Sequence, residues 1–127
     1  MKRLTLTALL ALAVVPLTQA ASRHDLNVWM RAIDARTVTV QKHLAAGRTD
    51  AAIADAQALQ KLYADMAVYF ERDYPAADAV GFSRDGEKLA ASIPGHVAQG
   101  DTAAAAQAAR AISLACNDCH DPYKPLP

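Results

Sequence analysis

Apolar side chains recur along the chain in alternating steps of three and four residues, the spacing of one face of an α-helix. The first such stretch runs from Ser22 to Ala46. Ser22 can cap its start, with Asp25 three residues later in the capping-box position, and Gly47 is a natural stop. The positions of its inner face are Leu26, Trp29, Met30, Ile33, Thr37, Val40 and Leu44.

A second helix is predicted to begin at Thr49 or Asp50, either of which can cap it. It should finish by Asp73, because Pro75 disfavours helical geometry in the preceding Tyr74. The apolar positions of this helix are Ala52, Ala56, Leu59, Tyr63, Met66 and Phe70, widened by Leu62 and Tyr69.

The third helix has the weakest pattern. We expect residues 74–81 to form the longest connection and the helix to start between Ser83 and Glu87, carrying Leu89, Ile93 and Val97 inward. Glycine and proline interrupt the pattern, so the sequence predicts a kinked or short helix ending at Gly100. The interrupting residues are Gly86, Pro94 and Gly95.

The fourth helix should start with Asp101 or Thr102 as its cap and run through Cys119, before Pro122 and Pro125 end it. Its alanine-rich inner face favours helix and close approach. The members of that face are Ala105, Ala108, Ala109, Ile112, Ala115 and Cys116. Four helices joined by short loops predict an all-α, up-down-up-down antiparallel four-helix bundle.

The first 20 residues have the pattern of a secretory signal peptide. Lys2 and Arg3 give a positive start, an apolar run follows, and small residues allow cleavage after Ala20. The run is too short for a comfortable membrane span, and no cysteine marks a lipid anchor. We therefore expect residues 21–127 to be one exported four-helix domain with no membrane span.

Charge adds little to this prediction. Without Lys2 and Arg3, the chain has 11 basic and 13 acidic side chains, which gives a formal charge of −2. No basic stripe appears, which argues against a nucleic-acid partner.

Both cysteines of the chain lie in Cys116-Asn117-Asp118-Cys119-His120, the C-x-x-C-H spacing of covalent c-type haem attachment. Two thiols on one helical turn can each form a thioether with the same porphyrin, and His120 would be the proximal iron ligand. Export favours this reading, because such attachment belongs outside the bacterial inner membrane. A thioredoxin-like site would need a βαβ context, and a zinc site would need a second ligand pair. A structural disulfide between the two cysteines is the remaining alternative.

The antiparallel topology predicts which residues approach this motif. The first helix starts, the second and fourth finish, and the third begins at one end of the bundle. The haem should therefore face Trp29, Met30, Met66, Tyr69, Phe70, Phe82 and Leu89.

The exported alanine-rich bundle and the ending Cys116-Asn117-Asp118-Cys119-His120-Asp121-Pro122-Tyr123-Lys124 resemble the cytochrome c prime family, the class II c-type cytochromes. The likeness covers the mature chain in architecture, and its specific residues are those of the ending. Pro122 departs from the family, whose helix continues past the histidine.

The resemblance implies one of two states at the sixth iron position. Low-spin members fill it with a methionine of the first helix and carry electrons, and Met30 stands where that methionine is expected. High-spin members leave the position empty and bind small gases such as nitric oxide. Core packing is the alternative role for Met30, and Met66 and His24 are further ligand candidates.

Other expected contacts are less specific. Trp29, Met66, Tyr69 and Phe70 would form the pocket wall. Arg23, Arg31 and Lys124 could pair with haem propionates, although each is equally well explained as a solvated charge.

The sequence thus predicts a periplasmic monohaem cytochrome that exchanges electrons with redox partner proteins and is not an enzyme. A gas-binding protein is the alternative, a non-haem bundle with a Cys116–Cys119 disulfide is a third class, and homodimerisation stays open.

Overall fold

The computed structural model describes residues 19–123, with side chains described as far as His120. The predicted signal peptide therefore lies outside the described residues, apart from Gln19 and Ala20. The helices are α1 (Arg23–Ala45), α2 (Thr49–Val68), η1 (Tyr69–Asp73), α3 (Ala77–Ala98) and α4 (Thr102–Tyr123).

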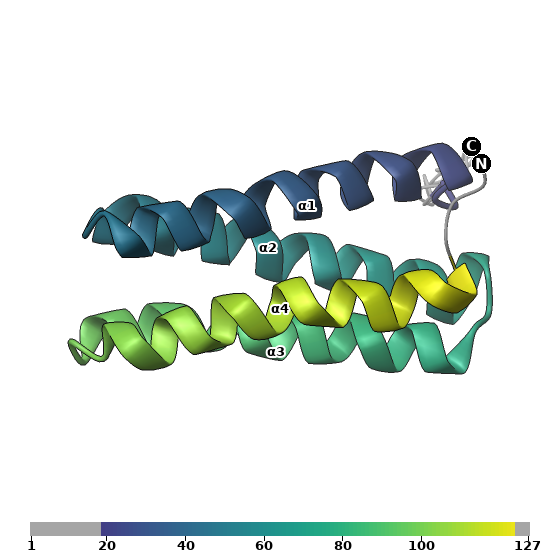
Figure 1. Ribbon diagram of the computed structural model, residues 1–127. Coiled ribbons are helices and arrows are strands. Elements are labelled where there is room, and N and C mark those ends of the chain that lie inside the picture. The colour runs from purple at the N-terminus through teal and green to yellow at the C-terminus, as the bar shows by residue number, and fades with distance from the viewer. Residues whose placement is uncertain (1–18, 124–127) are drawn as a thin grey trace, which may run out of the picture.

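The predicted all-α four-helix bundle is confirmed (Figure 1). Each long helix packs against its neighbours in the chain, and α1 packs against α4 to close the bundle. The start of α1, the end of α4 and the turn between α2 and α3 lie at one end (Figure 1). None of the described helices is long and apolar enough to cross a membrane.

The start and end of α1 follow the predicted signals. Ser22 Oγ accepts a hydrogen bond from Asp25 N (3.2 Å), and Asp25 Oδ2 accepts one from Ser22 N (2.7 Å), which completes the capping box. Gly47 follows the helix with a φ of +67°, a left-handed conformation that glycine adopts without a steric penalty.

The predicted start of α2 at Thr49 is confirmed, but the predicted cap is wrong, because Arg48 occupies the N-cap position and no side chain caps the helix. Its end at Asp73 is confirmed, but the last turn is a π-helix, η1, which the apolar pattern did not predict. The wide turn is closed by a hydrogen bond from Tyr74 N to Tyr69 O (2.9 Å). It buries the consecutive residues Tyr69 and Phe70 together.

The predicted late start of the third helix is wrong, and the helix is not short. α3 begins at Ala77, leaving a connection of three residues, and continues through Pro94 to Ala98. The reason is a buried face of small side chains that apolar periodicity does not detect. That face consists of Ala79, Ser83, Gly86 and Ala90, together with Ile93.

α4 is capped by Asp101, whose Oδ1 accepts a hydrogen bond from Ala104 N (2.9 Å), as predicted. The helix does not stop at Cys119 but continues to Tyr123. Pro122 falls in the last turn, where its missing N–H removes a single helical hydrogen bond and does not break the element. The attachment motif is therefore entirely helical.

The core fills the interior along the whole bundle. Its fully buried large side chains include Val40 from α1, Leu59 from α2, Ile93 from α3 and Ile112 from α4. The predicted inner faces of the first, second and fourth helices are buried or partly buried throughout. Packing of these faces positions the motif of α4 against the other three helices.

Candidate functional site

Cys116 and Cys119 stand three residues apart on α4, so their side chains lie on neighbouring parts of one helix face. Both thiols are free, which means that no disulfide joins them. Cys119 is 9% exposed and Cys116 is half-buried. Cys116 Sγ donates a hydrogen bond to Ile112 O (3.4 Å).

All four long helices contribute side chains to a cavity beside these thiols. Its volume is about 20 Å³, which is room for about one water molecule. The lining residues are Met30 and Ile33 of α1, Tyr63 and Met66 of α2, Phe82 of α3, and Ala115, Cys116, Cys119 and His120 of α4. The structure thus brings Met30, Met66 and Phe82 to the motif, as the topology predicts.

His120 has a buried ring nitrogen without a partner. Its Nε2 has no hydrogen-bond partner among the residues that the structure describes. Leaving a buried polar atom unsatisfied costs about 1–3 kcal/mol. The nitrogen thus keeps a free lone pair or a free proton on a residue that lines the cavity, so it is suited to bind a further group.

The thiols are uncharged at neutral pH. Burial raises the pKa of Cys116, and the charge of Asp34 adds to this effect, while a hydrogen bond with Tyr63 opposes it. Burial likewise raises the pKa of Cys119, with added repulsion from Cys116 and Asp78. A neutral thiol pair suits an apolar site better than a charged one.

Tyr63 belongs to the apolar positions predicted for the second helix, but its place beside the motif was not predicted. Its side chain is 6% exposed, and burial raises its pKa above the ordinary value, with contributions from Cys116 and Cys119. The ring lies on Gly86 of α3, where an added Cβ would come within 2.5 Å of the ring. The spacing of Tyr63 and Met66 on one helix face is the signal that could have identified it.

Several expected residues lie elsewhere. Trp29, Tyr69 and Phe70 are not among the cavity residues but form an aromatic cluster with Tyr74. The Trp29 and Tyr69 rings meet edge to face with centroids 6.3 Å apart, and those of Tyr69 and Phe70 are 5.1 Å apart. This cluster holds the start of α1 on η1.

The proposed propionate partners do not gather at the cavity. Arg23 and Arg31 are exposed and do not line the cavity. Leu89 of α3, which was expected to face the haem, is partly buried and does not line the cavity either. The side chain of Lys124 lies outside the described residues.

The donor set fits a haem, whereas the present space does not. Two thiols at the attachment spacing, an imidazole nitrogen and a thioether sulfur are the groups that hold c-type haem. Pockets for ligands of that size measure about 300–1,000 Å³, far more than this cavity. Met30, Phe82 and His120 are only partly buried, so the cavity lies near the surface and these three side chains form its rim.

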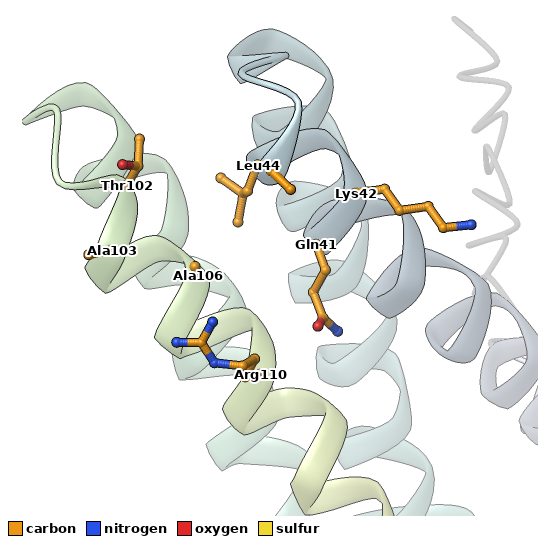
Figure 2. Close-up of a pocket in the computed structure, with 8 residues that line it drawn as sticks. Gln41, Lys42, Leu44, Thr102, Ala103, Ala106 and Arg110 are labelled. Atoms are coloured by element: carbon orange, nitrogen blue, oxygen red, sulfur yellow. The ribbon is translucent and has the colours of Figure 1, made fainter.

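A larger groove lies at the opposite end, between the end of α1 and the start of α4 (Figure 2). Its volume is about 550 Å³. Leu44 points towards α4, whereas Lys42 extends away from α4 and Arg110 lies across α4 itself (Figure 2). The two cations do not converge on a common point, so the groove has no assembled anion site.

Within the described part of the chain, no cluster of three or more histidine, cysteine or acidic side chains is placed to hold a metal ion directly. Comparison of the chain with protein-family models, curated proteins and solved structures finds no match.

Proposed function

We propose that this chain is a periplasmic monohaem c-type cytochrome that carries single electrons between redox partner proteins. The observation that supports the proposal best is the buried, unpartnered Nε2 of His120, a residue that lines one cavity with Cys116, Cys119 and Met30. In an exported chain these are the groups that attach haem c and ligate its iron.

Each residue then has a defined task. Cys116 and Cys119 would each hold the haem through one thioether, made when the S–H group adds across a vinyl double bond, and His120 Nε2 would hold the iron. The haem supplies reversible one-electron chemistry. The apolar lining, including Ile33 and Phe82, keeps water from the site. A dry, tightly packed surrounding changes little between two charge states, which favours electron transfer.

Two methionines could hold the iron together with His120. Met30 of α1 and Met66 of α2 both line the cavity with His120. Met66 is buried, at 3% exposure, whereas Met30 is partly buried at the rim. We propose Met30, because a rim side chain can turn onto an entering group while Met66 is fixed within the core.

The test is to export the full chain in a bacterium that attaches haem c and to record mass and absorption spectra. The expected mass shows one haem on the mature chain, and the spectra are low-spin in both oxidation states. Met30→Leu should make the haem high-spin and allow carbon monoxide to bind, whereas Met66→Leu, the matched control, should leave it low-spin.

Each other outcome has a distinct meaning. A chain without haem on the peptide that carries Cys116 and Cys119 contradicts the cytochrome proposal. A high-spin wild type that binds carbon monoxide assigns gas binding instead of electron transfer. Loss of the low-spin spectrum in Met66→Leu alone assigns Met66 as the ligand.

A further inference from the structure

Ala21 is joined to η1 by a hydrogen bond across the sequence. Its backbone N donates to Asp73 Oδ2 at 3.2 Å, which links residues 52 positions apart. The Ala21 side chain also packs against the core. Asp73 is partly buried at the end of η1, and within the described residues no side-chain cation pairs with it.

The neighbouring residues hold Ala21 in this position. Ser22 N is already bonded to Asp25 Oδ2 (2.7 Å) in the capping box, so it does not compete for Asp73. Gln19 and Ala20, by contrast, are exposed and have no regular structure. The chain thus changes from an exposed segment to an anchored one at the Ala20–Ala21 bond.

We propose that Asp73 is the binding site for the amino terminus that a signal peptidase creates by cutting after Ala20. Hydrolysis adds the hydroxyl of water to the Ala20 carbonyl carbon and a proton to Ala21 nitrogen. The released amine takes a further proton from solvent at neutral pH. A neutral N–H donor is thereby replaced by an ammonium facing the Asp73 carboxylate, and a charge-assisted hydrogen bond is stronger than a neutral one.

This inference rests on the export part of the proposed function and does not depend on haem. Cleavage after Ala20 would then stabilise the fold, because the new ion pair between Ala21 and Asp73 links the start of α1 to η1. Both elements belong to the end of the bundle that carries the thiols, and α1 carries Met30. The unprocessed chain has the weaker, neutral link.

The test uses the exported, processed protein, with its first residue identified by mass spectrometry. Wild type, Asp73→Asn and Asp85→Asn are each melted with a free α-amine and after selective acetylation of that amine near pH 6.5. Acetylation is selective because lysine amines have a pKa of about 10.4 and the α-amine about 7.7–8.0. Asp85 is the matched control, an exposed acidic residue of α3.

The expected first residue is Ala21. Asp73→Asn should lower Tm by about 2–4 °C in the free-amine protein and by less than about 1 °C after acetylation, which fits a partly exposed ion pair. Asp85→Asn should have equal, small effects in both forms. The Asp73 carboxylate should also raise the pKa of the α-amine in the folded protein. The extra loss of Tm in the free-amine form of Asp73→Asn should therefore be complete below about pH 7.7 and disappear as the amine loses its proton at higher pH.

Three results would overturn the inference: a different first residue, equal losses for Asp73→Asn with free and acetylated amine, or the same pattern in Asp85→Asn. The haem absorption spectrum of the same samples separates this outcome from the cytochrome proposal. A haem-free protein in which the effect of Asp73→Asn depends on the free amine contradicts the cytochrome proposal and supports the Asp73 site. A haem-loaded protein without that dependence contradicts the Asp73 site and supports the cytochrome proposal.

Discussion

Asp55 shows how a single residue can link two helices through buried charge. Its side chain on α2 is 3% exposed and faces two residues of α1. Arg36 Nη1 donates to Asp55 Oδ1, and His43 Nδ1 lies 2.9 Å from Asp55 Oδ2 without the alignment of a hydrogen bond. Burial alone would raise the pKa of Asp55, but the hydrogen bond from Arg36 and the charges of Arg36 and His43 hold it below its usual value.

Asp55→Asn should therefore destabilise the protein by about 1–3 kcal/mol at pH 7, the usual cost of removing a buried hydrogen bond to a charged group. Because the pKa is lowered in the folded state, this contribution is complete above the unfolded value of about 3.9 and is lost as the pH falls through the folded value. Urea denaturation of both proteins between pH 7 and pH 3 measures it. The gap between them should narrow below pH 4.

Asp65→Asn provides the comparison for that experiment. Asp65 pairs with Lys61 at 2.7 Å one turn away on α2, but the Lys61 side chain is 76% exposed. Such a pair contributes about 0.3–0.5 kcal/mol. If Asp55→Asn and Asp65→Asn lower the free energy of unfolding equally, the burial of Asp55 adds nothing to the strength of its ion pairs.

At the scale of elements, apolar spacing predicted three helices well and the third poorly. The inner face of α3 is made of alanine, serine and glycine, which give almost no periodic signal. In the sequence Gly86 interrupts the apolar pattern of the third helix. In the bundle the missing side chain of Gly86 leaves the space that the Tyr63 ring occupies. That relation depends on the register of α2 against α3, which one sequence does not contain. The π-turn of η1 was missed for the same reason, since its buried pair Tyr69 and Phe70 is stabilised by tertiary packing.

Gly86→Ala tests this relation directly. Alanine favours helix over glycine by about 0.5–1 kcal/mol, but here its Cβ would lie 2.5 Å from the Tyr63 ring. The buried ring would have to shift within a packed core, so we expect a net destabilisation of about 1–3 kcal/mol. Thermal and urea denaturation measure the change.

The matched control is Gly81→Ala on the same helix, where an added Cβ meets nothing within 4 Å. This variant should be more stable than wild type by up to about 1 kcal/mol, because it gains helix propensity without a clash. If Gly86→Ala were stabilised to the same extent, the Tyr63 ring would not be confined by Gly86.

For the whole molecule, the sequence predicted the antiparallel topology and hence that Met30, Met66 and Phe82 meet the motif. The sequence did not predict how small the cavity beside the motif would be. The size of the cavity depends on how Tyr63, Phe82 and their neighbours pack together. The cavity of about 20 Å³ means that the core is nearly complete without any added group.

A protein that cannot attach haem should therefore still fold. We expect the exported double variant Cys116→Ser with Cys119→Ser to keep the helical circular dichroism of the wild type and to melt cooperatively. Its core away from the motif, including Val40, Leu59 and Ile93, is fully buried without help from the thiols. Haem-loaded wild type should melt higher, by about 4–8 °C for each kcal/mol that the haem contacts add.

Hydrogen exchange on the two proteins then locates the rearrangement that a haem requires. Amides around Tyr63, Phe82 and Cys116 should differ in protection, because these side chains must move apart to admit a flat macrocycle. Amides around Val40 and Ala105, at the other end of the bundle, should be equally protected in both proteins, since neither residue lines the cavity. An unfolded double variant would mean that the bundle needs the haem as part of its core, and that the closed cavity described here is not a state the free chain can hold.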